Sequence, residues 1–398
     1  MKKAIYFMSV IAIAALLALF SLAAFAVNGC ASAKGEKALS SYNSRAAYLV
    51  DYQTGEVLYE RNADSRYPIA SMVKIMTLSI VFDEIEAGRL SVDDVITVSE
   101  EAAGMGGSQM FLDAGSDYKL GDLIKGVVVA SANDASVAIA ETVAGSKEAF
   151  IDLMNEKAAE MGLNDTRFVN VTGLPGENQY STAKDVTRML GYLLKHKEYF
   201  DYSTIYMENF THPGGRVSEL VNTNKLVRFY KGCDGGKTGF TSDAMYCLSA
   251  TAKRGEMRVI ATVLGAESSQ TRNKEISSMF NYAFANYNSV TLVEKGAPME
   301  AEIFVKGAKY GTVNVEADGN LAVLEKRGEK GAYKIETEIF DNLKAPIGKG
   351  QRIGVIRLVS EQTKDIKAEV GLVASEDIPK RGLSDSLEII LDKWFMGI

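Results

Sequence analysis

Hydrophobic and polar positions follow a strand-like pattern at the start of the globular region and a helical pattern directly after it. Ala46–Tyr52 and Val57–Arg61 are β-rich runs separated by turn-forming residues, and they predict a hairpin. From Ser71 the apolar residues recur every three or four positions until Gly88, a residue typical of a helix C-terminus. A helix is therefore expected to begin at Ser71.

The next part of the chain predicts more helices and then more strands. Helical spacing covers residues 120–128, 134–143, 150–161, 186–194 and 276–287. Met245–Lys253 and Met257–Leu264 are strand-like runs on either side of a short polar turn, which predicts a second hairpin. Strands at both ends with helices between them predict an α+β domain with an antiparallel sheet, which we assign to residues 40–288.

After residue 290 short alternating segments punctuated by glycines replace the helical pattern. They cover 301–304, 312–315, 332–339 and 353–358, and they predict a small all-β domain over residues 290–380. Residues 381–398 place Leu383, Leu387 and Trp394 on one apolar face, which predicts a C-terminal amphipathic helix. Such a helix can pack on its own chain or lie in a membrane interface. Its apolar end favours the membrane surface.

Residues 1–33 have the pattern of a secretory signal peptide. Lys2 and Lys3 precede an uncharged run that ends at Val27, and the small residues after it fit a cleavage site. The apolar run is also long enough for an uncleaved anchor, and Cys30 lies in a weak lipoprotein-like context. We therefore expect a protein that is secreted across the cytoplasmic membrane and held at its outer face.

Composition narrows the classes of function. The net charge of −7 argues against nucleic acid as a partner. Three cysteines and two histidines are too few for a zinc ribbon, an iron–sulfur cluster or a disulfide framework, and Cys233 and Cys247 are expected to be unpaired. His196 and His212 adjoin no nucleophile-elbow pattern, so we expect both to be solvated. If a serine is activated in this chain, a lysine must be its base.

Three Ser-x-x-Lys sequences compete for this chemistry, and they begin at Ser71, Ser116 and Ser181. Ser116 lies in a turn-like composition, and Ser181 precedes a helix in which Thr182 fits a capping position. Ser71 begins a helix with a buried pattern. Because residues i and i+3 share a helix face, Lys74 can reach the Ser71 hydroxyl. The positive end of the helix also favours an oxyanion beside the Ser71 N–H.

Two further motifs follow this pair in order. Ser131-Ala132-Asn133 falls between two predicted helices, and Lys237-Thr238-Gly239 is the only Lys-Thr-Gly in the chain. The three motifs together are the signature of active-site serine penicillin-binding proteins and β-lactamases. The chain from about residue 40 resembles the low-molecular-weight penicillin-binding proteins, which are serine-type D-alanyl-D-alanine carboxypeptidases. The resemblance extends to 68–71, 107–112, 170–175, 180–183 and 234–241.

The resemblance implies a β-lactamase/transpeptidase-like fold and a role for each site residue. Ser71 is the expected nucleophile, Lys74 its base and Ser131 a proton relay. The residues expected to bind substrate are Asn133, Lys237, Thr238, Gly239 and Phe240, with the N–H groups of Ser71 and Phe240 as the oxyanion hole. The implied substrate is a peptidoglycan pentapeptide ending in D-Ala-D-Ala, and β-lactam antibiotics are the implied inhibitors. No cofactor and no metal are implied.

Two alternative functions remain open from the sequence. A β-lactamase shares the fold and needs a fast deacylation step, and Glu160 lies in an E-x-x-L-N sequence that suits such a role. Glu160 falls on the polar side of its predicted helix, however, and we expect it to be solvated. A non-catalytic peptidoglycan-binding protein is the second alternative, and the intact Ser71, Lys74 and Lys237 argue against it.

Overall fold

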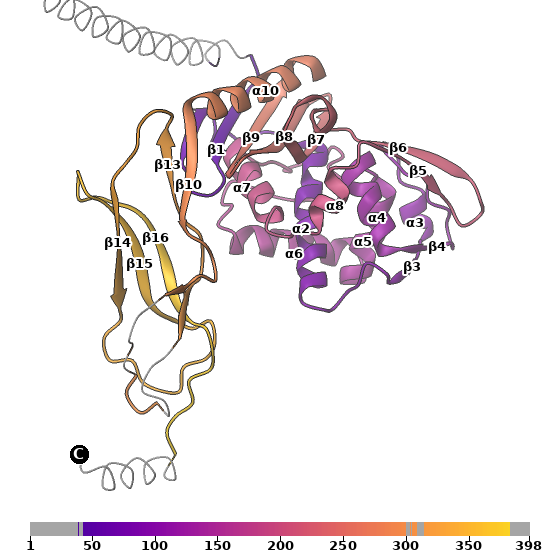
Figure 1. The fold of residues 1–398 in the computed structure, drawn as a ribbon. Coiled ribbons are helices and arrows are strands. Elements are labelled where there is room, and N and C mark those ends of the chain that lie inside the picture. The colour runs from indigo at the N-terminus through magenta and orange to yellow at the C-terminus, as the bar shows by residue number, and fades with distance from the viewer. Residues whose placement is uncertain (1–38, 40–42, 300–302, 304, 309–313, 383–398) are drawn as a thin grey trace, which may run out of the picture. The chain divides into compact units, whose positions relative to one another are not determined.

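The computed structural model describes residues 39, 43–299, 303, 305–308 and 314–382. It divides into two compact units, which are coloured by position along the chain in Figure 1. One unit runs to Val50 and adds Val57–Arg254 and Arg258–Asn286. The other takes two short turns, Asp51–Glu56 and Gly255–Met257, together with the chain from Tyr287 onward. The predicted signal segment 1–33 lies outside the described residues, as does 383–398 of the predicted C-terminal helix.

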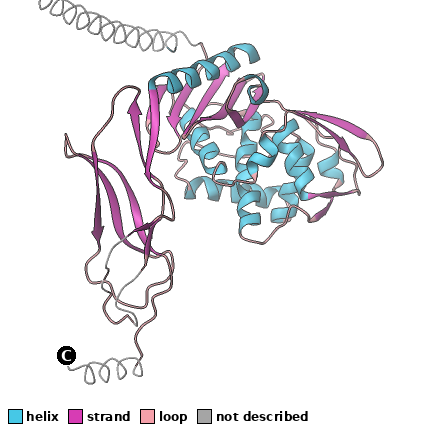
Figure 2. Cartoon of the chain, in the orientation of Figure 1, coloured by secondary structure: helices cyan, strands magenta, loops and turns pink. Residues whose placement is uncertain are grey.

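The first unit is built on a five-stranded sheet in the order β2-β1-β9-β8-β7. Both predicted hairpins are present in it. The strands are β1 (Ala46–Asp51), β2 (Val57–Arg61), β7 (Cys233–Thr241), β8 (Met245–Arg254) and β9 (Met257–Ala266). Helix α10 (Ser269–Asn286) covers one face of this sheet, while the remaining helices gather on the other face (Figure 1, Figure 2). The α+β prediction for this domain is therefore confirmed.

The central helix of this unit is α2 (Lys74–Glu86), and it differs at its start from the prediction. A 3-10 turn, η1 (Ala70–Val73), carries Ser71 and precedes the α-helix. Residues 74–82 of α2 are all buried, because other helices and the sheet surround this half of the helix. This buried half of the helix gives Ser71 and Lys74 a fixed support.

The second and third motifs are also placed by secondary structure. Helix α4 (Leu120–Lys125) continues as a π-helical turn, η2 (Gly126–Ala130), and helix α5 begins at Asn133 and ends at Ala144. Ser131 thus lies on a short connection between helices, as predicted. The other elements are β3 (Val95–Thr97), α3 (Glu100–Ala103), β4 (Asp117–Lys119), α6 (Lys147–Glu160), α7 (Ala183–Leu193), α8 (Tyr199–Ser203), β5 (Met207–Thr211), β6 (Val217–Val221) and α9 (Leu226–Phe229).

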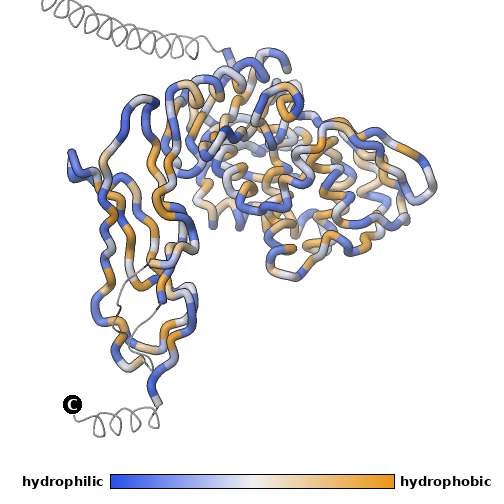
Figure 3. The backbone as a smooth tube through the Cα atoms, viewed as in Figure 1, coloured by the Kyte–Doolittle hydropathy of each residue, from blue (hydrophilic) through white to orange (hydrophobic). Residues whose placement is uncertain are grey.

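The second unit consists of β-structure around a core of its own. Its larger sheet has the order β11-β12-β16-β15-β14, and β10 pairs with β13 in a two-stranded sheet. Hydrophobic residues are interspersed with polar ones along these strands (Figure 3), and Ile353, Leu358 and Leu372 are fully buried. The strands are β10 (Tyr287–Val293), β11 (Pro298–Met299), β12 (Val315–Ala317), β13 (Leu321–Lys326), β14 (Tyr333–Ile339), β15 (Arg352–Ser360) and β16 (Ile366–Ala374).

This unit has the β-rich character that the glycine-punctuated pattern predicted. The segments 332–339 and 353–358 correspond to β14 and β15. Parts of the predicted segments 301–304 and 312–315 lie outside the described residues. Among the residues described, no helix is both long and apolar enough to cross a membrane.

Candidate active site

The Ser71 hydroxyl and the Lys74 amine lie together at the start of α2. The Lys74 Nζ atom is 3.1 Å from Ser71 Oγ, and it donates hydrogen bonds to Asn133 Oδ1 at 2.7 Å and to the Thr172 carbonyl at 2.6 Å. Lys74 is completely buried. Burial, and then the positive charge of Lys237, lower the pKa of Lys74 well below its ordinary value. Both effects favour the neutral amine, which is the form that can accept a proton.

Gly173 allows a loop to approach the nucleophile closely. Its φ of +82° suits glycine, and a Cβ atom at this position would lie 2.0 Å from the Ala70 carbonyl oxygen and 2.6 Å from the Ser71 nitrogen. Asn170 fixes the turn, because its Oδ1 accepts a hydrogen bond from the Gly173 N–H at 2.7 Å. The loop thus brings the Thr172 carbonyl to Lys74.

Asn133 is oriented by a second loop. Its Nδ2 donates to the Gly106 carbonyl at 2.6 Å, and its backbone N–H donates to the Ser108 carbonyl at 2.7 Å. With Nδ2 committed to Gly106, Oδ1 of the same amide faces Lys74. The side chain is therefore fixed in one orientation.

Ser131 and Lys237 form the other hydrogen-bonded pair of the site. Lys237 Nζ donates to Ser131 Oγ at 2.7 Å and to the Thr238 carbonyl at 3.1 Å. Ser131 has a φ of +62°, an uncommon value for a residue other than glycine. Burial, and then the charge of Arg272, lower the pKa of Lys237 to about 7. The Lys237 charge is thus sensitive to any anion that enters the site.

Strand β7 lies directly against η1. A Cβ atom at Gly239 would be 2.5 Å from the Ile69 carbonyl oxygen, so glycine is required for this approach. Thr238 Oγ1 donates to Thr223 Oγ1 at 2.8 Å. The Phe240 side chain is 55% exposed, with its ring centroid 4.4 Å from that of Tyr246. The eight predicted site residues therefore fall on η1 and the start of α2, on the connection into α5 with its first residue, and on β7.

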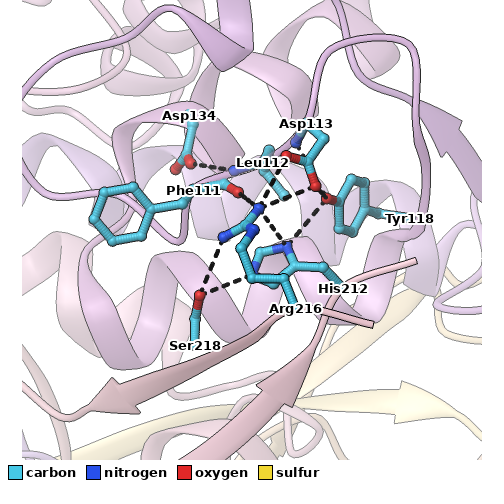
Figure 4. Close-up of polar contacts among 8 residues, drawn as sticks. All are labelled: Phe111, Leu112, Asp113, Tyr118, Asp134, His212, Arg216 and Ser218. Carbon is cyan, nitrogen blue, oxygen red and sulfur yellow. Dashed lines mark hydrogen bonds and ion pairs between the residues drawn. The ribbon is translucent and has the colours of Figure 1, made fainter. Parts of the chain in front are cut away.

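A network behind the Asn133 loop holds residues 110–113 from two sides (Figure 4). Asp134 accepts hydrogen bonds from the N–H groups of Met110 at 3.2 Å and Leu112 at 3.1 Å. Arg216, beside the β5–β6 hairpin, donates to the Phe111 carbonyl at 2.5 Å and to both carboxylate oxygens of Asp113 at 3.0 Å. These contacts stabilise the loop that orients Asn133.

Both histidines are buried, and our expectation that they are solvated is wrong. His212 is 2% exposed and His196 is 5% exposed. His212 lies in the network of Figure 4, where its Nδ1 is 3.1 Å from the Tyr118 hydroxyl. Burial, and then the charge of Arg216, lower the pKa of His212. The burial of the two histidines was not predicted because their neighbours in sequence are polar. Residues that are distant in sequence cover them in the folded chain.

The other two Ser-x-x-Lys sequences form no serine–lysine pair. Lys119 binds Asp93 at 2.8 Å, and Lys184 binds Asp64 at 3.0 Å. The Thr182 side chain caps α7 by accepting from the Asp185 N–H, as predicted. Glu160 is 70% exposed, which agrees with its prediction as a solvated residue. Cys233 and Cys247 are free and buried, which confirms the expectation that they are unpaired.

Three contributors to the site were missed from the sequence. The Thr172 carbonyl is a backbone group and leaves no residue-type signal. Thr223 reaches Thr238 from a segment far from any motif. Arg272 is buried on α10 at a position four residues before the buried Ile276. A charged residue on an apolar helix face is a signal that could have revealed Arg272.

The sheet with helices on both faces, together with a serine hydrogen-bonded to a buried lysine at the start of its central helix, defines a transpeptidase-like active-site serine enzyme. A family model for D-alanyl-D-alanine carboxypeptidases matches residues 32–268, and a model for the penicillin-binding protein 5 C-terminal domain matches 287–380. The chain belongs to the peptidase S11 family of D-alanyl-D-alanine carboxypeptidases, the low-molecular-weight penicillin-binding proteins. Its activity is that of a serine-type D-Ala-D-Ala carboxypeptidase.

Similar proteins cover nearly the whole chain. The D-alanyl-D-alanine carboxypeptidase DacF of Bacillus subtilis (strain 168) is 38% identical over 375 residues, which is 94% of this chain and 96% of that protein. DacC of Escherichia coli (strain K12) is 36% identical over 349 residues, 86% of this chain and 85% of its own. The crystal structure of penicillin binding protein 5 from Haemophilus influenzae has a TM-score of 0.69 at 30% identity, covering 85% of this chain and 98% of that one.

Proposed function

We propose that this carboxypeptidase removes the terminal D-alanine from peptidoglycan pentapeptide stems through an acyl-enzyme on Ser71. The observation that carries the proposal is the environment of the Lys74 amine. A neutral amine has two N–H donors and one lone pair. With the Asn133 and Thr172 oxygens accepting both donors of the neutral amine, its lone pair is available to the Ser71 hydroxyl, whose Oγ is 3.1 Å from Nζ.

In the acylation step, Ser71 Oγ gives its proton to Lys74 Nζ and attacks the carbonyl carbon of the penultimate D-alanine. The backbone N–H groups of Ser71 and Phe240 stabilise the oxyanion. The bond from this carbon to the terminal D-alanine nitrogen then breaks. Ser131 relays a proton to the leaving amine, and water later hydrolyses the ester to regenerate Ser71. No step in this scheme calls for a metal or an organic cofactor.

Substrate binding is assigned to β7 and to Asn133. Lys237 supplies a cation for the terminal carboxylate, and the Thr238 hydroxyl lies beside it in the strand. A carboxylate in contact with Lys237 favours the charged amine and raises its pKa from about 7. Gly239 keeps the strand against η1, and the Asn133 amide binds the substrate amide while it holds Lys74.

A β-lactam acylates Ser71 in the same way and leaves a persistent adduct, because Glu160, the carboxylate whose sequence context suits a deacylating role, is solvated. The Glu160 side chain is exposed and lies 3.6 Å from Lys157 Nζ, which supports a carboxypeptidase over a β-lactamase. The proposed partners are therefore a D-Ala-D-Ala pentapeptide and β-lactam antibiotics, with no nucleic acid.

The proposed location of the enzyme, at the outer face of the cytoplasmic membrane, rests on the sequence patterns of its N-terminal and C-terminal segments. We assign residues 1–33 to a secretory signal, 40–288 to the catalytic domain, 290–380 to the β domain and 381–398 to an amphipathic helix on the outer face of the cytoplasmic membrane. The support for this assignment is the pattern of the sequence.

Labelled penicillin tests the nucleophile directly. The label should attach to Ser71, and Ser71→Ala should abolish both labelling and D-alanine release from a D-Ala-D-Ala pentapeptide. A thermal melt equal to that of the wild type serves as the control for folding. Label on Ser116 or Ser181 would contradict the assignment.

A further inference from the structure

A second cluster of chemically active side chains lies at the other end of α2, outside the active site. Asp83 and Glu86 are three residues apart near the C-terminus of this helix, and His196 follows α7. One ligand atom from each of the three residues lies within 4.8 Å of the others. His196 Nε2 is 3.2 Å from Asp83 Oδ1, and His196 Nδ1 is 3.1 Å from Glu86 Oε2. The carboxypeptidase reaction uses none of these groups.

The His196 ring is buried with a nitrogen that lacks a hydrogen bond. It is 5% exposed, and its Nε2 atom makes no hydrogen bond despite its short distance to Asp83. The Phe82 ring stacks on the imidazole with centroids 5.8 Å apart, and Tyr192 packs edge-on at 5.8 Å. These rings keep Nε2 away from water. Buried polar atoms without a partner are rare in native proteins, so this atom points to a bound ligand.

The distance between His196 Nε2 and Asp83 Oδ1 is that of two ligand atoms on one metal ion. Bonds of about 2.0–2.1 Å to a tetrahedral zinc ion place two ligand atoms about 3.3 Å apart. The 3.2 Å between His196 Nε2 and Asp83 Oδ1 agrees with this edge. Glu86 lies beside the other ring nitrogen, Nδ1, and must rotate to reach an ion at Nε2. Its side chain is 76% exposed, which leaves it free to do so.

The surroundings of Asp83 resemble those of a metal-binding carboxylate. The Tyr192 hydroxyl donates to Asp83 Oδ1 at 2.8 Å, and Lys157 Nζ is 2.8 Å from Asp83 Oδ2. Hydrogen bonds of this kind orient carboxylates that bind metals. Asp83 and Glu86 together carry two negative charges, and Lys157 carries one positive charge. The remaining negative charge attracts a cation.

We propose that Asp83, Glu86 and His196 bind one divalent cation of the zinc class, through His196 Nε2 and one oxygen from each carboxylate. One nitrogen and two oxygens suit a borderline cation such as Zn²⁺. The sequence predicted no metal, and the proposal departs from that prediction because the three ligands meet only in the folded chain. The site requires only one histidine, so it is compatible with a chain that has two.

Such an ion would join the C-terminal end of α2 to the segment that leads into α8. This segment reaches the catalytic strand, because the Tyr199 hydroxyl accepts a hydrogen bond from the Gly236 N–H at 3.0 Å, one residue before Lys237. The ion would thus stabilise the support of the active site without taking part in the reaction.

Calorimetric titration of the chelator-treated full chain with ZnCl₂ tests the proposal. We expect one equivalent to bind, with a rise in melting temperature that EDTA reverses. Glu86→Gln should weaken binding by at least about tenfold, because it removes a ligand. Glu160→Gln is the matched control, since it also removes an exposed carboxylate near Lys157, and it should bind zinc like the wild type. D-alanine release should be unchanged in both variants.

The same samples distinguish metal binding from a competing explanation, in which His196 is a doubly protonated imidazolium between two carboxylates. Nitrogen NMR should show that the His196 Nε2 resonance shifts on addition of zinc. A doubly protonated ring that zinc leaves unshifted would overturn the proposal. Equal zinc affinity in the wild type and Glu86→Gln, or no binding at all, would overturn it too.

Discussion

Gly173→Ala is expected to damage catalysis far more than folding. The new Cβ atom would lie 2.0 Å from the Ala70 carbonyl oxygen, whereas ordinary contact begins at 3.4 Å. Either the 170–174 loop or η1 must therefore shift by more than 1 Å. Thr172 and Ser71 lie on these two segments, so the shift separates the Thr172 carbonyl from Lys74 or displaces Ser71. A misplacement of about 1 Å in a catalytic site can cost about 10²-fold in rate, and we expect a loss of that order in kcat/KM.

The matched control is Gly162→Ala. Gly162 also has a positive φ, +67°, but open space surrounds the position where its Cβ would lie. Both variants carry the cost of a left-handed alanine, about 1–2 kcal/mol, which is a fall of a few degrees in Tm. Only Gly173→Ala adds the clash. Release of D-alanine and the rate of labelling by penicillin measure the difference. If a folded Gly173→Ala enzyme matched Gly162→Ala in both assays, the geometric argument for this loop would fail.

Three further predictions follow from the site and the termini. The Lys74→Ala variant should be acylated at least about 10²-fold more slowly in a penicillin-labelling time course, because the general base is lost. Acylation at the wild-type rate would show that Lys74 is not the base. Glu160→Gln should leave the lifetime of the penicillin adduct unchanged, and rapid penicillin turnover that this substitution stops would favour a β-lactamase. Deletion of 381–398 from protein lacking residues 1–33 should release it from lipid vesicles with its activity on a soluble peptide intact, and unchanged vesicle binding would reject the helix as the anchor.

Local patterns predicted the regular elements well where one face of an element is buried. The two hairpins β1–β2 and β8–β9 and the helices α2, α6 and α7 were found within a few residues of their bounds, whereas α10 begins at Ser269, well before the predicted start at Ile276. The β5–β6 hairpin was missed because its residues are largely exposed and polar, so no apolar alternation marks them. Strands β13 and β16 were also missed, and the second of these begins with exposed residues.

The sequence by itself determined the chemistry that the protein can perform. Three motifs in order specify two serines, two lysines and an asparagine, and their side chains carry the reacting groups wherever the backbone places them. Hydrophobic periodicity likewise determined which segments become strands or helices, since it depends on neighbours only a few residues apart.

The tertiary structure decided how those groups behave. The lowered pKa of Lys74 requires burial by segments from distant parts of the chain, together with the charge of Lys237. The carbonyl of Thr172 is a backbone group that no residue type identifies, and His196 is buried by rings from α2 and α7. Burial, backbone acceptors and long-range charge depend on contacts between residues far apart in sequence, and local patterns contain no record of them.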